Sequence, residues 1–436
     1  MSGKAIPAAF RFLHASDFRL ELPVLGVTNV PEHLRDTLID APYRAAMTVF
    51  DTAVAERVDF VVLSGNIINP HAAGPRGVHF LQEQFTRLAR EQISVYWSCG
   101  PSDRIDLWPA SAPLPTNVQV FSADRVSSVA HRRNNNTIAT IQGCGHRKSH
   151  VIHASEFAGD NARFSVAVSY GAGNPKSMRA SRVNYWALGG RHDRHTLFTS
   201  PRIAQYSGSP QGRSPDEVDI HGCTLVDVDE AGIVTRQMVP TDVVRWQTER
   251  IDLPDHMDSQ GLLRHLRDRL RQLSTTHSDK LLMVSWQVVD SDQLTDTRSD
   301  LLAAQLRQSD LPQEIIGTLR NEFGMTVPGV WTESLSADTP SVYPAGWYEE
   351  DTVLGDLLRA VQHFQNDKNQ AVELDGWDSD TPLSPELTHA LRIGDDADRE
   401  YVLRHVAALG VDLLRGDRVL SEELASIPSW TEENKA

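Results

Sequence analysis

Short apolar segments alternate with helix-compatible stretches through the first 240 residues, and this alternation restricts the fold more than any other feature. Six segments carry several apolar residues and end near Gly, Ser or Asp: Phe10–His14, Phe60–Ser64, Ile93–Ser98, Thr137–Gln142, Phe164–Ser169 and Tyr185–Leu188. Such segments are typical of buried strands that end in loops. Helical spacing at 42–58 and 78–90 separates the first three. Strand, helix and strand in this order predict βαβ units and an α/β fold.

The sequence changes character after a further strand-like segment at Cys223–Val228. Leucines at helical spacing, with Arg and Asp on the opposite face, predict an amphipathic helix: Leu262, Leu263, Leu266, Leu270 and Leu273. A strand-like run at Leu281–Val289 and a polar helical stretch at 290–311 follow, which predicts a small α/β domain. Helical patterns after Asp351 and around Val402 flank an acidic linker at Glu373–Pro385. The predicted domains are 8–240, 241–350 and 351–427.

Functional residues of open α/β sheets gather in the loops at the carboxyl ends of the strands. Here five strand-end segments can be compared: Leu13–Arg19, Val62–Asn66, Ser98–Asp103, Val168–Gly171 and Tyr185–His192. Their order and spacing resemble the motifs D-x-H, G-D, G-N-H-[DE], H-G and G-H-x-H of the calcineurin-like metallophosphoesterases. The turn Gly208–Arg213 further resembles the SbcD/YhaO type of DNA repair exonuclease subunit. The likeness covers roughly residues 8–365. It implies a four-layer αββα sandwich, a small α/β cap domain and C-terminal helices.

The resemblance also implies a site for two divalent metal ions, about 3.5–4 Å apart, that clamp a phosphate and activate water. Oxygen and imidazole ligands would suit manganese or a similar ion. Carried over position by position, Asp17 and His192 remain as ligands. The other motif positions hold residues that the family does not use there: Arg19, Asn66, Pro101, Ser102, Tyr170 and Gly190. The bridging carboxylate is lost with Asn66, and the catalytic histidine with Ser102.

These replacements favour a protein without a dedicated dimetal site. Arg19 places a permanent cation where a metal would lie, because a guanidinium keeps its proton in proteins. We expect Arg19 to pair with Asp17 and to replace the first metal electrostatically, since an unpaired buried carboxylate is costly. No cofactor is therefore expected. The chain is interpreted as a catalytically inactive or impaired homologue, a pseudoenzyme that acts as a structural or regulatory subunit.

Two other functions stay open. An active divalent-metal-dependent phosphodiesterase would need ligands from elsewhere, for instance Asp103, His195 or Tyr170. A nucleic-acid-binding module would keep the groove of the fold without chemistry. The net charge of −16 argues against general affinity for DNA, because DNA binding rests on Lys and Arg that neutralise phosphates. The tight basic segments are His131–Arg133 and Arg191–His195.

Other histidines and carboxylates have simpler interpretations. Asp17 could cap backbone amides, and His192 could be a hydrogen-bonding loop residue. His14 ends an apolar strand and is expected to be a core histidine with a hydrogen-bond partner. A metal role for three closely spaced histidines is disfavoured, because the matching region of the family lies outside the metal centre: His146, His150 and His153.

Partners and location follow from the resemblance and from composition. An SbcC-like ATPase is the implied partner, docking on the C-terminal helices, and a homodimer is implied as well. No apolar run reaches the roughly 18 residues that span a bilayer, and the N-terminus does not resemble a secretory signal. The three cysteines are widely spaced and form no CxxC pair. A reduced, cytoplasmic protein is predicted.

Overall fold

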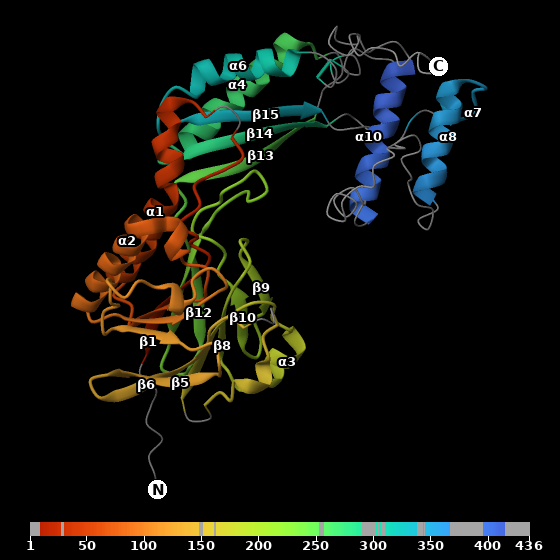
Figure 1. Cartoon of the computed structure of the whole chain (residues 1–436). Helices are drawn as coiled ribbons and strands as arrows, with labels where there is room; N and C mark the ends of the chain where they lie inside the picture. The colour runs from red at the N-terminus through yellow and green to blue at the C-terminus, as the bar shows by residue number, and fades with distance from the viewer. Residues whose placement is uncertain are drawn as a thin grey trace, which may run out of the picture. The chain divides into compact units, whose positions relative to one another are not determined.

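The computed structural model describes residues 9–27, 30–147, 151–160, 163–252, 257–289, 302, 305–306, 310–337, 343, 345–366 and 396–414 (Figure 1). The chain forms two compact units. The first consists of Met1–Gln247, Leu273–Val284 and Phe323–Glu333, and the second of Thr248–Gln272, Ser285–Glu322 and Ser334–Ala436. The division into domains at 240 and 350 stays a prediction.

The first unit contains a six-stranded sheet in the order β12-β11-β1-β2-β3-β4. Its strands are β1 (Phe10–Ala15), β2 (Phe60–Leu63), β3 (Ser94–Ser98), β4 (Val118–Phe121), β11 (Gly222–Val228) and β12 (Val234–Pro240). Strands β1 to β4 are parallel, whereas β11 pairs antiparallel with both of its neighbours. The loops after β1, β2 and β3 therefore leave the same edge of this sheet.

A second six-stranded sheet has the order β5-β6-β7-β8-β10-β9. Its strands are β5 (Ser127–Arg133), β6 (Asn136–Cys144), β7 (Phe164–Tyr170), β8 (Tyr185–Gly189), β9 (His195–Phe198) and β10 (Ile203–Tyr206). Strands β6, β7, β8 and β10 are parallel, and β5 and β9 pair antiparallel at the two edges.

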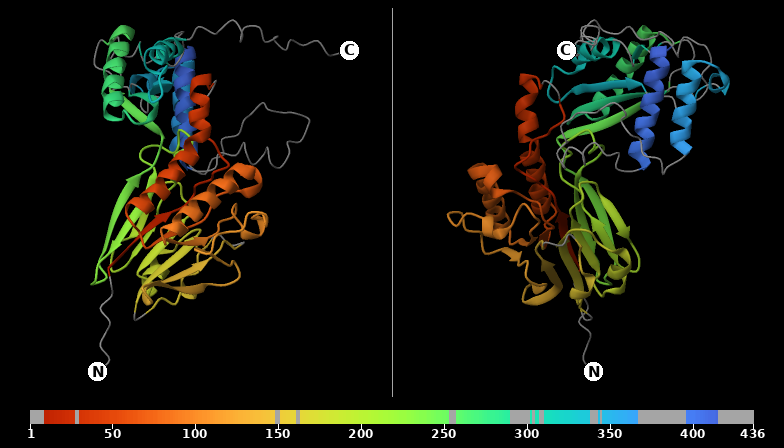
Figure 2. Two further views of the ribbon diagram at one scale, coloured as in Figure 1. Left: turned by 90° about the vertical axis from the view of Figure 1, so that its left-hand side faces the viewer. Right: turned by 45° about the vertical axis from the view of Figure 1, so that its right-hand side comes forward.

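Successive residues of a strand point to opposite faces of its sheet, so each strand contributes side chains to the core on either side. In β1, Phe10 and Phe12 belong to the core that also contains Val166 of the second sheet. Leu13 and Ala15 belong to the core under two helices, α1 (Glu32–Ala55) and α2 (Pro70–Arg90). The outer face of the second sheet packs on α3 (Pro175–Ala180) through a third apolar cluster. The predicted αββα sandwich is confirmed (Figure 2).

All six strands predicted from apolar segments are present, but both helices begin earlier than predicted. In α1, Leu34 and Leu38 extend the buried face ahead of Pro42, so the proline lies inside the helix rather than in its first turn. The side chain of Asn69 caps the first N–H groups of α2. Gly74, at φ 62°, and the following proline interrupt that helix. Regular helical spacing therefore starts only near Val78.

The amphipathic helix and the strand predicted for the second half are also present. Strands β13 (Val244–Asp252), β14 (Leu281–Val289) and β15 (Val330–Ala337) form a three-stranded sheet, and the division between the two units falls within these strands. The connecting helices are α4 (Ser259–Thr276) and α6 (Leu311–Phe323). Four of the five leucines on the predicted stripe of α4 are buried, and Leu263 is half-buried.

Helices α7 (Ala345–Glu349), α8 (Val353–Asn366) and α10 (Asp396–Leu414) complete the second unit. Leu358 and Val361 of α8 pack with Leu403, Ala407 and Val411 of α10. The predicted linker at Glu373–Pro385 and most of 290–311 lie outside the described residues. Among the described helices, none combines the length and apolar character needed to cross a membrane.

Candidate functional site

The motif positions predicted from the sequence meet at one edge of the sandwich. Asp17 and Arg19 follow β1, and Asn66 follows β2. The backbone is left-handed at all three residues, with φ of 55°, 44° and 54°. Backbone bonds from Asp17 N to Gly65 O and from Arg19 N to Asn66 O, both 2.9 Å, join the two loops. Non-glycine residues in this conformation cost energy and persist where the surroundings determine them.

The first polar cluster is centred on Asn66. Its Nδ2 donates to the hydroxyl of Tyr170 at 2.7 Å and to Asp17 Oδ1 at 3.3 Å. Its Oδ1 accepts from the hydroxyl of Ser102 at 2.8 Å. The other oxygen of Asp17 accepts from the backbone N–H of Gly190 at 2.9 Å. The residues at the ligand positions therefore hydrogen-bond to one another.

Burial has the largest effect on the pKa values of Asp17 and Tyr170 in this cluster. Asp17 is fully buried, and burial raises its pKa, although donation from Gly190 N–H acts in the opposite direction. Burial and the nearby Asp17 carboxylate raise the pKa of Tyr170 to about 12. The tyrosine hydroxyl is thus neutral at physiological pH and acts as a hydrogen-bond acceptor for Asn66.

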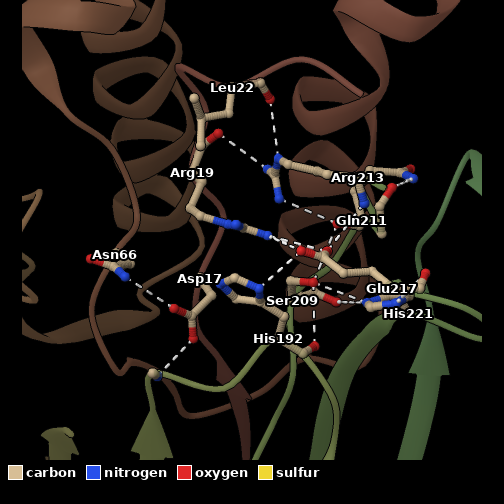
Figure 3. Close-up of polar contacts among 12 residues, drawn as sticks. Asp17, Arg19, Leu22, Asn66, His192, Ser209, Gln211, Arg213, Glu217 and His221 are labelled. Carbon is tan, nitrogen blue, oxygen red and sulfur yellow. Dashed lines mark hydrogen bonds and ion pairs between the residues drawn. The ribbon is translucent and has the colours of Figure 1, made fainter. Parts of the chain in front are cut away.

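The second cluster is centred on Glu217, which lies in the loop before β11 (Figure 3). Its Oε1 lies 2.8 Å from Arg19 Nη2 and 2.9 Å from His192 Nδ1. Its Oε2 accepts from the backbone N–H of Arg213 at 3.1 Å. Burial by itself raises the pKa of Glu217. The hydrogen bond from His192 and the charge of Arg19 outweigh burial and lower that pKa to about 2.

Arg213, in the glycine-rich turn before Glu217, holds the two loops of the second cluster together. Its guanidinium donates to the carbonyl oxygens of Phe18, Arg19 (3.1 Å) and Leu22 (3.1 Å). Burial and the nearby Arg19 lower the pKa of Arg213 to about 9. One buried guanidinium, of Arg213, and one mostly buried guanidinium, of Arg19, thus lie near one glutamate.

The predicted pair of Arg19 with Asp17 is wrong, because Arg19 pairs with Glu217 instead. Both oxygens of Asp17 already accept hydrogen bonds, from Asn66 and from Gly190. The Nε atom of Arg19 is buried without a hydrogen-bond partner among the described residues. The sequence reasoning missed Glu217, whose position four residues after Arg213 was the available signal.

Tyr170 occupies the space between the glycines of the motifs. A Cβ atom added to Gly65 would lie 2.7 Å from the ring of Tyr170, and one added to Gly190 would lie 3.1 Å from it. Gly190 also has a φ of 102°, which other residues rarely adopt. The tyrosine and the glycine are therefore sterically matched replacements for the two histidines that the motifs would place there.

The residues that an altered metal site would need are engaged elsewhere. Asp103 is buried, and its oxygens accept from the backbone N–H groups of Asn66, Ile67 and Gly100 and from the indole of Trp97. Burial raises its pKa to about 6 despite these donors. It orders the loops around Asn66 and Gly100. His195 lies on the edge strand β9, with its ring against Tyr206.

The donor set does not fit a dimetal centre. Within the part of the chain that the structure describes, no group of three or more His, Cys, Asp or Glu side chains is placed to hold a metal ion. Asp17 and His192 belong to different clusters, because the imidazole is bonded to Glu217 rather than to Asp17. Arg19 adds a cation beside them. A positive side chain repels a divalent cation, and a neutral amide cannot supply the negative charge of a bridging carboxylate.

The basic segments are tied into the fold. His131 is buried and bonds to the hydroxyl of Tyr96 at 2.9 Å, and Arg133 pairs with Asp59 at 3.0 Å. Arg191 lies over the ring of Tyr206, 5.8 Å from its centroid. His14 is buried against the hydroxyl of Tyr185, as expected for a core histidine. Residues His146 and His153 lie in loop segments, and His150 falls outside the described residues.

Replacing Tyr170 with phenylalanine is expected to lower the free energy of unfolding of the first unit by about 1 kcal/mol, because Asn66 Nδ2 loses its shorter acceptor. Urea denaturation followed by tryptophan fluorescence would measure the change. Tyr43→Phe is the matched control, since the Tyr43 ring packs in the same unit while its hydroxyl makes no hydrogen bond to the described residues. Equal effects of the two substitutions would contradict a role for the Tyr170 hydroxyl.

Similarity to known proteins agrees with this architecture. No protein-family model matches the chain. It is 25% identical over 277 residues to the uncharacterized metallophosphoesterase YhaO of Bacillus subtilis (strain 168), covering 60% of this chain and 68% of that protein. The αββα sandwich and the motif loops at one edge agree with this similarity to a metallophosphoesterase.

Solved structures show weaker likenesses. A dimetal phosphatase from Danio rerio is 11% identical, covers 51% of this chain and 93% of its own, and has a TM-score of 0.33. Zinc-bound Vps29 from Entamoeba histolytica is 14% identical, covers 53% of this chain and 99% of its own, and has a TM-score of 0.25. TM-scores this low do not assign a fold on their own.

Proposed function

We propose that this chain is a catalytically inactive or severely impaired metallophosphoesterase homologue of the SbcD/YhaO type, acting as a structural or regulatory subunit in DNA-processing complexes. The observation that carries the proposal is the ion pair between Arg19 and Glu217, 2.8 Å long and mostly buried among the motif loops. In the family, the position of Arg19 belongs to a metal ligand. The charge that orders these loops here comes from the chain itself.

The composition of the two clusters supports this proposal. Asn66 has no negative charge with which to bridge two cations, and its amide is already bonded to Tyr170, Asp17 and Ser102. The ring of Tyr170 fills the space beside Gly190. Ser102 donates to Asn66, and within the described residues no histidine or carboxylate is hydrogen-bonded to its hydroxyl. A serine nucleophile without an adjacent base is weak.

The proposed partner is an SbcC-like ATPase that contacts helices α8 and α10. Val406, Leu409 and Leu413 are exposed and recur along α10 at helical spacing, on the side away from the residues that pack on α8. A homodimer and a cytoplasmic location are further proposals. Nucleic-acid binding by the chain alone is disfavoured by its net charge of −16.

An active metal-dependent phosphodiesterase is the alternative. It draws support from Asp17 and His192, two residues of ligand type that remain in loops at the same edge of the sandwich. Manganese or another divalent ion would then be the cofactor, and His192 would have to leave Glu217 to reach it.

Metal content and hydrolysis distinguish the two functions. After purification with manganese, the full chain is expected to hold far less than one metal ion per molecule. It should hydrolyse bis(p-nitrophenyl) phosphate no faster than the double variant Asp17→Ala/His192→Ala. Inductively coupled plasma mass spectrometry and a colorimetric assay would measure the two quantities. Two bound ions per chain, or turnover that disappears in the double variant, would overturn the proposal in favour of the active enzyme.

A further inference from the structure

Strand β12 is an edge strand of the first six-stranded sheet, and the left-hand view of Figure 2 shows the β11–β12 pair along the border of the first unit. It is seven residues long and pairs with β11 without a register shift. The other edge strands of the two six-stranded sheets are shorter or irregular. Strands β4 and β9 have four residues each, and β5 has a register shift between His131 and Arg132. Strand β12 is therefore the longest regular edge of the sandwich.

Hydrogen bonds at the two ends of the β11–β12 ladder show which way its backbone groups point. At the turn, Asp229 N donates to Ile233 O at 3.0 Å, and at the other end Thr241 N donates to His221 O at 3.0 Å. Bonded pairs alternate with non-bonded pairs in an antiparallel ladder, and both end pairs have the same phase. Three residues of β12 therefore turn their N–H and C=O groups away from β11: Val234, Arg236 and Met238. Among the described residues, nothing hydrogen-bonds to these outward groups.

Arg236 is the one charged residue of β12, and its side chain points between the two sheets. Its Nη1 donates to the side-chain oxygen of Gln205 on β10, which is fully buried. Arg194, in the loop between β8 and β9, lies close enough to repel Arg236 electrostatically. Neither guanidinium is in an ion pair with a carboxylate of the described residues. The free edge of β12 thus combines unpaired backbone groups with a positive charge that has no acidic partner.

We propose that the free edge of β12 binds an extended segment of a partner protein as an additional antiparallel strand, with an Asp or Glu of that segment opposite Arg236. Strand addition satisfies the free N–H and C=O groups of a sheet edge, and the neighbouring side chains select the sequence that is bound. Residues directly opposite each other in a ladder point to the same face of the sheet. A carboxylate opposite Arg236 would therefore meet its guanidinium.

A second copy of this chain fits the same edge less well. Pairing of two β12 strands would bring a second Arg236 to the edge, and β12 has no carboxylate to offer. An inward-pointing charge on an edge strand is a common means of preventing such pairing, because an unpaired charge is costly to bury. The same charge favours a strand that brings a carboxylate. Arg236 thus determines which strand the edge accepts.

The free edge of β12 contains no residue of the Asn66 or Glu217 clusters. It also lies on a different part of the chain from α8 and α10, which are proposed to contact an ATPase. Strand addition therefore goes beyond the proposed function, and its test does not depend on whether the chain hydrolyses phosphodiesters.

Fluorescence anisotropy on the full chain tests the proposal with the heptapeptide fluorescein-TVTETVT-amide. Its central glutamate is placed opposite Arg236, and its valines are placed opposite Val234 and Met238. We expect it to bind about tenfold more tightly than the same peptide with glutamine at the centre, because only the carboxylate makes a charge-assisted bond. Methylating the backbone nitrogens of the glutamate and the two valines should abolish measurable binding, since these N–H groups face β12.

Two variants test the edge itself. Met238→Pro removes an outward N–H and leaves the bonds to β11 in place, and proline is tolerated on edge strands. It should weaken binding of the glutamate peptide about tenfold or more, with little change in the midpoint of urea denaturation. Arg236→Gln should bind the glutamate and glutamine peptides equally. Arg132→Gln, on the edge strand β5, is the matched control and should leave the affinity unchanged.

No binding at millimolar peptide, equal binding of the N-methylated peptide, or equal binding of the glutamate and glutamine peptides to the wild type would each overturn the proposal. The peptide comparisons need no variant, so they serve even if Met238→Pro lowers stability. Sedimentation velocity without peptide is expected to show the same oligomeric state for the wild type and Met238→Pro. A dimer that dissociates in Met238→Pro would assign the edge to a second copy and overturn the proposal as well.

Discussion

Replacing Glu217 with glutamine is expected to lower the free energy of unfolding of the first unit by about 3–5 kcal/mol. The substitution keeps the shape of the side chain and removes its charge. Arg19 would then lose its charged partner while the buried guanidinium of Arg213 lies nearby, and His192 would lose its charged partner as well. Urea denaturation followed by tryptophan fluorescence would measure the change.

Glu56→Gln is the control for this substitution. Glu56 pairs with Arg11 at 2.6 Å, but both side chains are about two-fifths exposed, so its loss should cost at most about 1 kcal/mol. If both substitutions had the same small effect, the Glu217 cluster would not be what orders the motif loops.

The dependence on pH gives a second measure of the same cluster. The pKa of Glu217 falls from an ordinary 4.5 to about 2 in the folded chain, so its stabilisation is complete above pH 4.5 and is lost as the pH falls towards 2. A shift of this size corresponds to about 3 kcal/mol. The difference in unfolding free energy between the wild type and Glu217→Gln should therefore shrink over that range. Asp17 and Asp103, whose pKa values are raised, also make the unfolding free energy depend on pH. Both proteins contain these two residues, so their contributions cancel in the difference.

Replacing Gly189 with alanine is expected to destabilise the first unit by about 3 kcal/mol or more. Gly189 ends β8, where the second sheet lies against the loops that follow β1 and β2. A Cβ atom there would lie 1.9 Å from the carbonyl oxygen of Ser64 and 2.9 Å from the Cβ of Ser16. The nearest of these atoms belongs to the backbone, so the clash is relieved only if the two sheets separate. The midpoint of urea denaturation would report the loss.

Gly232→Ala is the comparison for this substitution. Gly232 lies in the turn between β11 and β12 with φ of 80°, and an added Cβ atom would meet nothing within 4 Å. Only the left-handed backbone penalises alanine there, at about 1–2 kcal/mol. An effect of Gly189→Ala no larger than this would contradict the close approach of the two sheets.

The sandwich could be predicted because its strands are short, apolar and bounded by loop residues. Segments such as Phe60–Ser64 are buried on both faces, which gives a continuous apolar run that few other structures produce. The start of α1 could not be placed in the same way. Leu34 and Leu38 continue its buried face ahead of Pro42, but the proline marks a helix start equally well from sequence.

The position of the site was predictable, whereas its charge pairing was not. Asp17, Arg19 and Asn66 follow the ends of two predicted strands. Parallel strands end at the same edge of a sheet, so these residues were expected to lie close together. Which carboxylate Arg19 meets depends on side-chain directions in left-handed loops. Glu217 is 198 residues away in the chain and belongs to no motif that was recognised. Proximity in sequence made Asp17 the expected partner of Arg19, whereas in the structure Arg19 pairs with Glu217.

The Arg19–Glu217 pair also bears on how this protein matures in a cell. A site ordered by bound ions must be loaded after synthesis and can be emptied or filled with the wrong ion when supply changes. Here the guanidinium and the carboxylate are encoded in the chain, so each molecule carries them in a fixed ratio from translation onward. Under the proposed function, the order of the Arg19 and Glu217 loops would require neither nutrient ions nor the transporters and chaperones that deliver them.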